Sequence, residues 1–185
     1  MKKGTYGYIK KKKIFQLGLS IGLLLIAIII YVIGYYLNNE QKNNVFTIIA
    51  VLMVLPASKA FTSFIVVAPF KTVSLEKMKE VEKYITSDSI LLTDLVLTST
   101  EKVMNLDFMF ITEDNIIGIT KKEKQDINYI ENYLSKVMKN QDYHCHVKIF
   151  SDYKTFINRI STIDGNTSNK TVLENMKNHI LTYGI

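Results

Sequence analysis

Two long apolar runs dominate the first part of the chain. They extend from Ile14 to Leu37 and from Val45 to Phe70, and the short polar stretch Asn38 to Asn44 joins them. As a helix rising 1.5 Å per residue, the first run would extend about 36 Å, which exceeds the ~30 Å hydrocarbon core of a bilayer. It is also too long for a cleaved signal peptide. The pattern predicts an uncleaved two-helix transmembrane hairpin over residues 14–70.

The distribution of lysines predicts how this hairpin is oriented. Residues 1–13 hold six lysines and no acidic residue, whereas the polar stretch between the runs holds only Glu40 and Lys42. Short cytoplasmic flanks carry an excess of Lys and Arg. We therefore expect a two-pass protein of the cell membrane with both termini in the cytoplasm. We also expect Lys10, Lys11, Lys12 and Lys13 to contact anionic lipids of the bilayer.

The remaining residues, 71–185, alternate between helical and strand periodicities. Ser74 is a candidate N-cap for a first helix, and Ser151 for a later one. The turn-forming residues 112–115 separate two strand-like runs. The expected elements are helix 74–86, strands 90–98, 103–111 and 116–120, helix 125–140, strand 144–150, and helices near 151–160 and 171–181. The sequence thus predicts an α/β fold for a cytoplasmic domain with the order α-β-β-β-α-β-α-α.

The net charge of the chain is unevenly distributed between its parts. The net charge is +6, but residues 71–185 carry 15 basic and 16 acidic side chains, so the excess belongs to the membrane flank. We therefore expect no nucleic acid as a partner. The single cysteine, Cys145, excludes an internal disulfide, which suits a reducing compartment.

Two features of the hairpin have alternative interpretations. Gly18 and Gly22 have the spacing that lets helices approach closely, either within the hairpin or between two copies of the chain. Lys59 is a cation in an apolar run, three residues after Pro56. It could form a charged site within the membrane. Alternatively, the spanning helix ends near Pro56, and residues 57–70 lie on the membrane surface with Lys59 reaching the lipid headgroups.

The candidate chemistry of residues 71–185 begins with one acidic strand residue. Asp94 interrupts an apolar strand, so it lies either at an exposed edge or buried beside donors, for which Thr98, Ser99 and Lys102 are near in sequence. A site could combine Asp94, Ser99 and Lys102 with Asp107 of the next strand. Ser99-x-x-Lys102 also has the spacing of a Ser-Lys acyl-transfer pair.

A second candidate is the run His144-Cys145-His146. On a strand, both imidazoles would share one face and the thiol would take the other. The two histidines could bind zinc if His179 or a carboxylate completed the site. The simpler alternative is a solvent-facing histidine pair over a buried cysteine. The sequence indicates no cofactor.

The first six elements of the cytoplasmic domain resemble the core of the PD-(D/E)XK nuclease superfamily. That resemblance implies a metal-binding Asp on the second strand, where Asp107 lies, and a Glu-x-Lys on the third strand. The third strand, Ile116-Ile117-Gly118-Ile119-Thr120-Lys121, has no acidic residue. The resemblance therefore implies at most a degenerate version of the fold.

A second resemblance covers most of the chain. The opening residues 1–9, residues 44–50 and 55–59, and Leu97-Thr98-Ser99-Thr100-Glu101-Lys102 look like an uncharacterised family of two-pass membrane proteins of Firmicutes bacteria. Some members carry the label "O-linked GlcNAc transferase-like". The sequence does not support that label, because it contains no nucleotide-sugar motif and no helical repeats.

Two hypotheses about function follow from these patterns. In the first, a membrane-tethered, non-enzymatic α/β interaction module binds a protein partner or another copy of itself. In the second, a membrane-anchored hydrolase uses a divalent metal near Asp94 and Asp107.

Overall fold

The computed structural model describes residues 2–120, 125–163 and 169–185. The chain forms two compact units. The hairpin unit comprises residues 10–70, and the α/β unit comprises residues 71–185 together with the first nine residues of the chain. The first nine residues, expected to be only a basic flank, therefore belong to the α/β unit.

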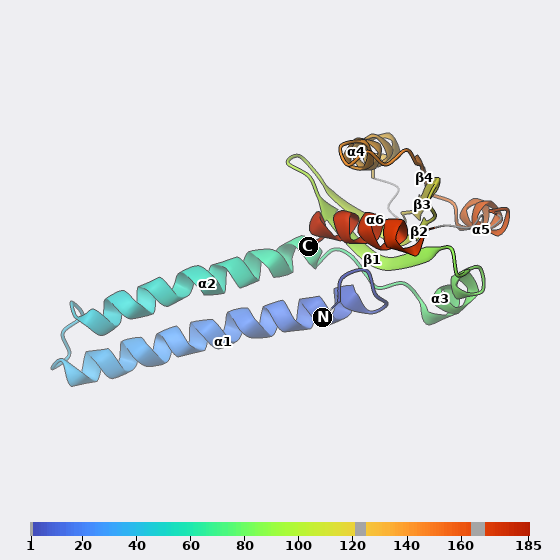
Figure 1. Cartoon of the computed structure of the whole chain (residues 1–185). Helices are drawn as coiled ribbons and strands as arrows, with labels where there is room; N and C mark the ends of the chain where they lie inside the picture. The colour runs from blue at the N-terminus through green and yellow to red at the C-terminus, as the bar shows by residue number, and fades with distance from the viewer. Residues whose placement is uncertain (1, 121–124, 164–168) are drawn as a thin grey trace. The chain divides into compact units, whose positions relative to one another are not determined.

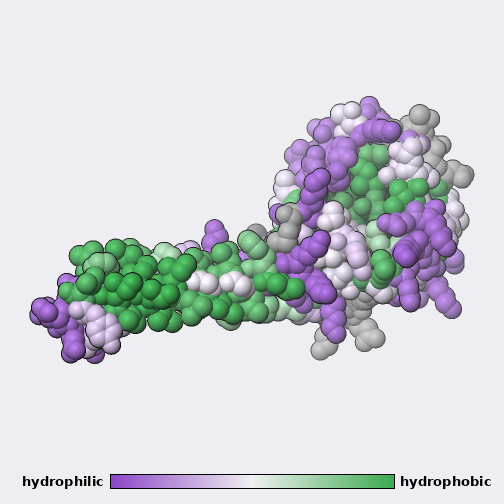
Figure 2. All heavy atoms as spheres, turned by 90° about the horizontal axis from the view of Figure 1, so that it is seen from below, coloured by the Kyte–Doolittle hydropathy of each residue, from purple (hydrophilic) through white to green (hydrophobic). Residues whose placement is uncertain are grey.

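The hairpin unit contains the two helices expected from the apolar runs. Helix α1 spans Tyr8–Leu37 and helix α2 spans Val45–Val67, and the two lie side by side in Figure 1. Each is long and apolar enough to cross a membrane. Figure 2 shows a surface of apolar side chains along this unit, with polar residues gathered at the loop that joins the helices. Helix α1 begins six residues earlier than expected, so the lysines at positions 10–13 lie on the helix.

Polar contacts join the two helices of the hairpin unit near one end. The Lys13 ammonium donates to the carbonyl oxygens of Ala68, at 2.6 Å, and Phe70, just after α2. Such a cation satisfies carbonyl groups that a helix end leaves without partners. Further along, the buried Ser20 hydroxyl donates to the carbonyl oxygen of Ala57 at 3.1 Å.

Helix α2 continues through Pro56 to Val67 without a break. The expected helix end near Pro56 is therefore wrong, whereas the placement of residues 57–70 on the membrane surface stays a prediction. A proline removes one main-chain donor, but the flanking turns keep their helical geometry. Lys59 lies on this continuous helix and is exposed.

The glycines of α1 differ in their surroundings. A Cβ added at Gly34 would lie 2.2 Å from the Cβ of Phe46 on α2, so the helices touch there. A Cβ at Gly18 or Gly22 would meet no atom within 4 Å. The helices of the hairpin therefore pack at Gly34, and the alternative role of Gly18 and Gly22 in pairing two copies stays a prediction.

The α/β unit has the predicted order of elements, a mixed α/β fold. Strands β1, β2 and β3 are antiparallel neighbours, β4 runs parallel to β3, and the sheet order is β1-β2-β3-β4. The elements are α3 (Leu75–Glu82), β1 (Ile90–Thr98), β2 (Val103–Ile111), β3 (Asn115–Ile119), α4 (Ile127–Lys139), β4 (His146–Phe150), α5 (Tyr153–Ser161) and α6 (Lys170–Thr182).

Helix starts follow the capping residues, with two corrections. Asp126, Asp152 and Asn169 cap α4, α5 and α6 through their side chains. The predicted cap Ser151 is wrong, because Asp152 accepts the N–H of Thr155 instead. Ser74 does precede α3, but its side chain makes no capping bond.

Two apolar clusters cover the sheet. Helices α4 and α6 pack on one cluster, together with Leu95, Leu97 and Leu106 of the sheet. Helices α3 and α5 contribute to the other cluster, around Phe108 and Phe110. Because neighbouring side chains on a strand alternate between faces, this division assigns each helix pair to one face of the sheet.

The alternation slips by one residue at the same place on β1 and β2. Leu92 and Leu95 of β1 belong to the same cluster although they are three residues apart, and so do Leu106 and Met109 of β2. Asp94 lies within the first interval and has a φ of 52°. The pairs on either side, Thr93 with Phe108 and Leu95 with Leu106, keep one register. In both strands, the side chains therefore change faces at this point, where Asp94 has a left-handed backbone conformation.

The Gly34 contact yields a test of the hairpin. Gly34→Ala should lower the free energy of unfolding by about 2 kcal/mol, because the added methyl overpacks against Phe46. Gly22→Ala is the matched control on the same helix, since its methyl group meets open space. Chemical denaturation of the full chain in detergent measures both. Equal losses in the two variants would contradict the packing described here.

Candidate functional site

The outer edge of β1 is covered by both ends of the described chain. The N–H of Thr93 donates to the carbonyl oxygen of Gly4 at 3.0 Å. Further along the strand, the N–H of Thr98 donates to Tyr183, and the N–H of Ile185 donates to Val96. An uncovered sheet edge offers free donors and acceptors to other chains. The terminal segments remove that hazard, and they contact each other where the Tyr8 hydroxyl donates to the carbonyl oxygen of Ile185 at 2.8 Å.

Asp94 is fully buried and accepts hydrogen bonds from both chain connections to the hairpin. The N–H of Gly7 donates to Oδ2 at 2.9 Å, and the N–H of Val73 donates to Oδ1 at 3.2 Å. The Thr72 side chain and the N–H of Ile9 also donate to it. We call this arrangement the Asp94 clamp. The donors expected from Thr98, Ser99 and Lys102 are wrong, because the clamp draws on residues 7–9 and 72–73.

Burial raises the pKa of Asp94, and the hydrogen bonds from Val73, Thr72, Gly7 and Ile9 oppose that rise. A raised folded-state pKa means that the folded chain holds the proton more tightly than the unfolded chain. The stability contributed by this group is therefore largest below its ordinary pKa of about 3.9. It declines as the pH rises through the higher folded-state pKa.

The other residues of the predicted acidic site serve local structure. The Ser99 hydroxyl accepts the N–H of Lys102 at 2.9 Å and lies 2.8 Å from the Tyr129 hydroxyl, so it closes the β1–β2 turn. The Lys102 ammonium pairs with Asp126 at 3.1 Å. The Ser-Lys pair for acyl transfer is therefore not formed. Asp107 is buried on β2 at the register position facing Asp94.

The histidine and cysteine candidates do not come together as a metal site. Strand β4 begins at His146, so His144 and Cys145 precede it and the expected alternation of the three side chains does not apply. Within residues 2–120, 125–163 and 169–185, no three His, Cys, Asp or Glu side chains are grouped to hold a metal ion. Burial raises the pKa of the Cys145 thiol to about 11, which makes it a poor nucleophile. Lys121, the last residue of the run compared with the third strand of the nuclease core, lies outside the described residues.

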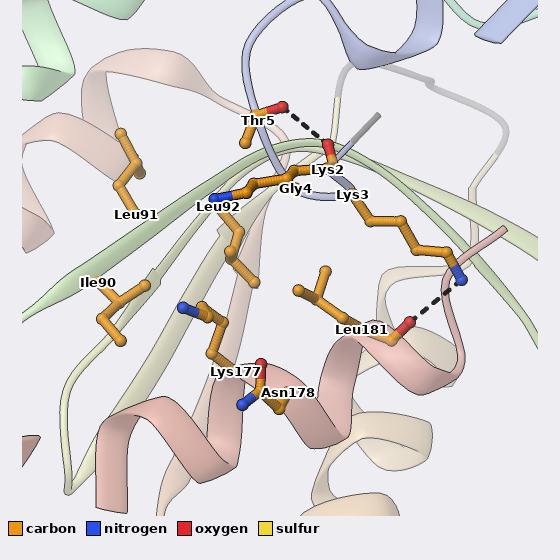
Figure 3. A pocket seen from close by; sticks show the side chains of 10 residues that line it. All are labelled: Lys2, Lys3, Gly4, Thr5, Ile90, Leu91, Leu92, Lys177, Asn178 and Leu181. Carbon is orange, nitrogen blue, oxygen red and sulfur yellow. Dashed lines mark hydrogen bonds between the residues drawn. The ribbon is translucent and has the colours of Figure 1, made fainter. Parts of the chain in front are cut away.

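A basic groove, which sequence reasoning missed, lies between the N-terminal segment, β1 and α6 (Figure 3). Its volume is about 530 Å³. In Figure 3, the ammonium groups of Lys2 and Lys177 point to the same side of the groove, whereas Lys3 turns away toward Leu181. Ile90, Leu92 and Leu181 supply apolar walls.

A second cavity, the tyrosine hollow, lies between the β1–β2 turn, α4 and the segment after α6. Its volume is about 460 Å³. The rings of Tyr129 and Tyr133 stack with centroids 6.4 Å apart, and Tyr183 meets Tyr133 edge-on at 6.0 Å. The polar lining consists of Ser99, Thr100, Glu101, Asn132, Lys136 and Asn140. Burial raises the pKa of Tyr133, and the neighbouring Tyr183 and Tyr129 add to that rise.

Comparison with protein-family models, curated proteins and solved structures finds no match to this chain. The site is therefore argued from its own geometry.

Part of the tyrosine hollow could have been predicted from the sequence. Tyr129 and Tyr133 are four residues apart on a predicted helix, and such a pair shares one face. Tyr183 and the groove lysines gave no pattern, because Lys2 and Lys177 lie at opposite ends of the chain.

The Asp94 clamp yields a prediction about stability. Asp94→Ala should lower the free energy of unfolding by about 3 kcal/mol, because the N–H groups of Gly7 and Val73 are left buried without an acceptor. Asp142→Ala is the matched control, since Asp142 also has a positive φ, 59°, but is exposed. Thermal and chemical unfolding of the full chain measure the difference. Similar losses in both variants would attribute the effect to backbone strain alone.

Cys145 yields a prediction about reactivity. Because its pKa rises from 9.0 to about 11, the thiolate fraction near pH 8 falls about 100-fold. Alkylation by iodoacetamide at that pH should be slower in the folded chain by that factor than in the denatured chain. A folded-state rate equal to the denatured rate would show that the thiol is accessible and ionised.

Proposed function

We propose that this protein is a two-pass, cell-membrane-anchored interaction module with both termini and its α/β unit in the cytoplasm, and that it binds a protein partner without catalysing a reaction. Two helices able to cross a membrane support the anchor. The lysine-rich residues 1–13 support the orientation, because short cytoplasmic flanks carry such an excess.

The tyrosine hollow is the observation that carries the proposed partner site. Tyrosine is enriched where proteins bind one another, because its ring offers a large apolar area at a small cost in conformational entropy. The Tyr129 and Tyr133 hydroxyls are held by Ser99 and by the carbonyl oxygen of Thr98, so the rings are preorganised. Polar side chains at the rim, such as Asn132 and Lys136, surround this aromatic centre. An aromatic centre within a polar rim is the usual anatomy of a binding hot spot.

The alternative, a metal-dependent hydrolase, has less support. Asp94 is committed to main-chain N–H groups, and Lys102 is committed to Asp126. The interaction module is consistent with these hydrogen bonds and this ion pair, because it requires the acidic residues only for structure.

Site-specific cross-linking in membranes tests the proposed function. A photoreactive residue placed at Asn132 of the full chain should give a discrete adduct with one protein, and the same probe at Lys154 on α5 should not. Tyr129→Ala should weaken the interaction about 30-fold, since a hot-spot residue contributes about 2 kcal/mol.

Tyr143→Ala is the control for the loss of a tyrosine, because Tyr143 is also half-buried but does not line the hollow. An adduct that forms equally from Asn132 and Lys154, or that survives Tyr129→Ala, would contradict the proposed site. Adducts between two copies of the chain would identify the partner as the protein itself.

A further inference from the structure

The basic groove has a charge pattern that suits a phosphate group. Lys2, Lys3 and Lys177 contribute three cations, and no carboxylate is among the described residues that line the groove. The Lys3 ammonium already donates hydrogen bonds to the carbonyl oxygens of Gly184 and Leu181, so fewer of its donors are available to a ligand. Lys177 pairs with Glu174, which is outside the lining. In Figure 3, the ammonium groups of Lys2 and Lys177 lie on the same side of the view, one above the Leu92 side chain and one below it.

The walls of the groove suit something more apolar than a free phosphate ion. Ile90 and Leu91 are half-buried, and Leu92 and Leu181 complete the apolar lining beneath the lysines. The amide of Asn178 and the hydroxyl of Thr5 add neutral polar groups at the lining. A ligand with an anionic head and an adjoining apolar chain satisfies both parts of the groove.

The position of the groove along the chain points to the source of such a ligand. Thr5, which lines the groove, precedes by nine residues the apolar run that begins at Ile14. Because the groove residues lie so near the proposed membrane anchor in sequence, a lipid of that membrane is the phosphate compound that we consider. Clusters of Lys and Arg that adjoin a membrane helix in sequence are known to bind anionic headgroups.

We infer that the basic groove binds the phosphate headgroup of an anionic membrane lipid, with Lys2 and Lys177 contacting the phosphate and Ile90 and Leu92 contacting the start of an acyl chain. This site is separate from the tyrosine hollow. It rests on the membrane anchor and not on the proposed protein partner.

Native mass spectrometry of the full chain in a neutral detergent tests this inference. The chain is titrated with phosphatidylglycerol, with phosphatidylcholine and with inorganic phosphate. Phosphatidylglycerol should bind most tightly. The double variant Lys2→Gln/Lys177→Gln should weaken that binding about 30-fold, because each cation near a headgroup contributes about fivefold and the two factors multiply. Lys139→Gln/Lys154→Gln is the control for the loss of two exposed lysines.

A steric variant separates the groove from the lysines at positions 10–13, which also attract anionic lipid. Asn178→Phe fills the groove without changing any charge, and it should weaken binding as strongly as the double variant. Asn175→Phe, on the same helix but outside the lining, should bind as the unmodified chain does.

Three results would overturn the inference. Unchanged binding in Asn178→Phe or in Lys2→Gln/Lys177→Gln would place the lipid elsewhere. Equal affinity for phosphatidylcholine would remove the charge requirement. Inorganic phosphate binding as tightly as phosphatidylglycerol would assign the groove to a soluble phosphate. A loss of the Asn132 adduct has no bearing on these outcomes, so the two proposals fail independently.

Discussion

The rest of the α/β unit depends on the hydrogen bonds that the buried Asp94 carboxylate accepts. Gly7 immediately precedes α1, and Val73 follows α2 by six residues, so the two chain connections to the hairpin both bond to one buried group. An ionised carboxylate inside a protein is costly unless several donors surround it. Here the donors come from the two segments that must leave the unit for the hairpin. Because the buried carboxylate requires these donors, both connections leave the α/β unit beside Asp94.

The same residue explains why one apolar cluster continues along the whole length of the first two strands. The positive φ of Asp94 breaks the alternation of β1, and β2 slips with it without losing register. Asp and Asn adopt this backbone conformation more readily than other non-glycine residues. One position thus combines a local backbone role with a long-range hydrogen-bonding role.

Much of this fold could be predicted from local patterns. The bounds of β1 and β2 were predicted correctly, because Ser99 and Lys102 close a short turn between two β-rich runs. The hairpin helices followed from their length and apolarity alone. Prediction failed where a contact joins residues that are distant in sequence. Strict alternation along β1 would put Asp94 on the face of Leu92, and nothing near it in sequence indicates Gly7 or Val73 as its partners.

The candidate sites were less predictable for the same reason. Tyr129 and Tyr133 belong to a predicted helix, but Ile130 and Leu134 form its buried face, so helical periodicity alone gives the tyrosines no role. Tyr183 completes the hollow from the other end of the α/β unit. Of the two acidic residues that the sequence favoured, Asp94 belongs to the Asp94 clamp, and Asp107 is buried on β2 at the register position facing it.

The first nine residues show that the α/β unit does not consist of residues 71–185 alone. Gly4 covers the edge of β1, Gly7 donates to Asp94, and Lys2 and Lys3 line the basic groove. Residues 71–185 alone are nearly neutral, so the positive charge of the groove depends largely on this N-terminal segment. A fragment that begins at residue 71 would expose the β1 edge and leave Asp94 without two of its donors. The segment expected to be only a basic flank is therefore part of the α/β unit, and the chain passes through this unit before it forms the hairpin.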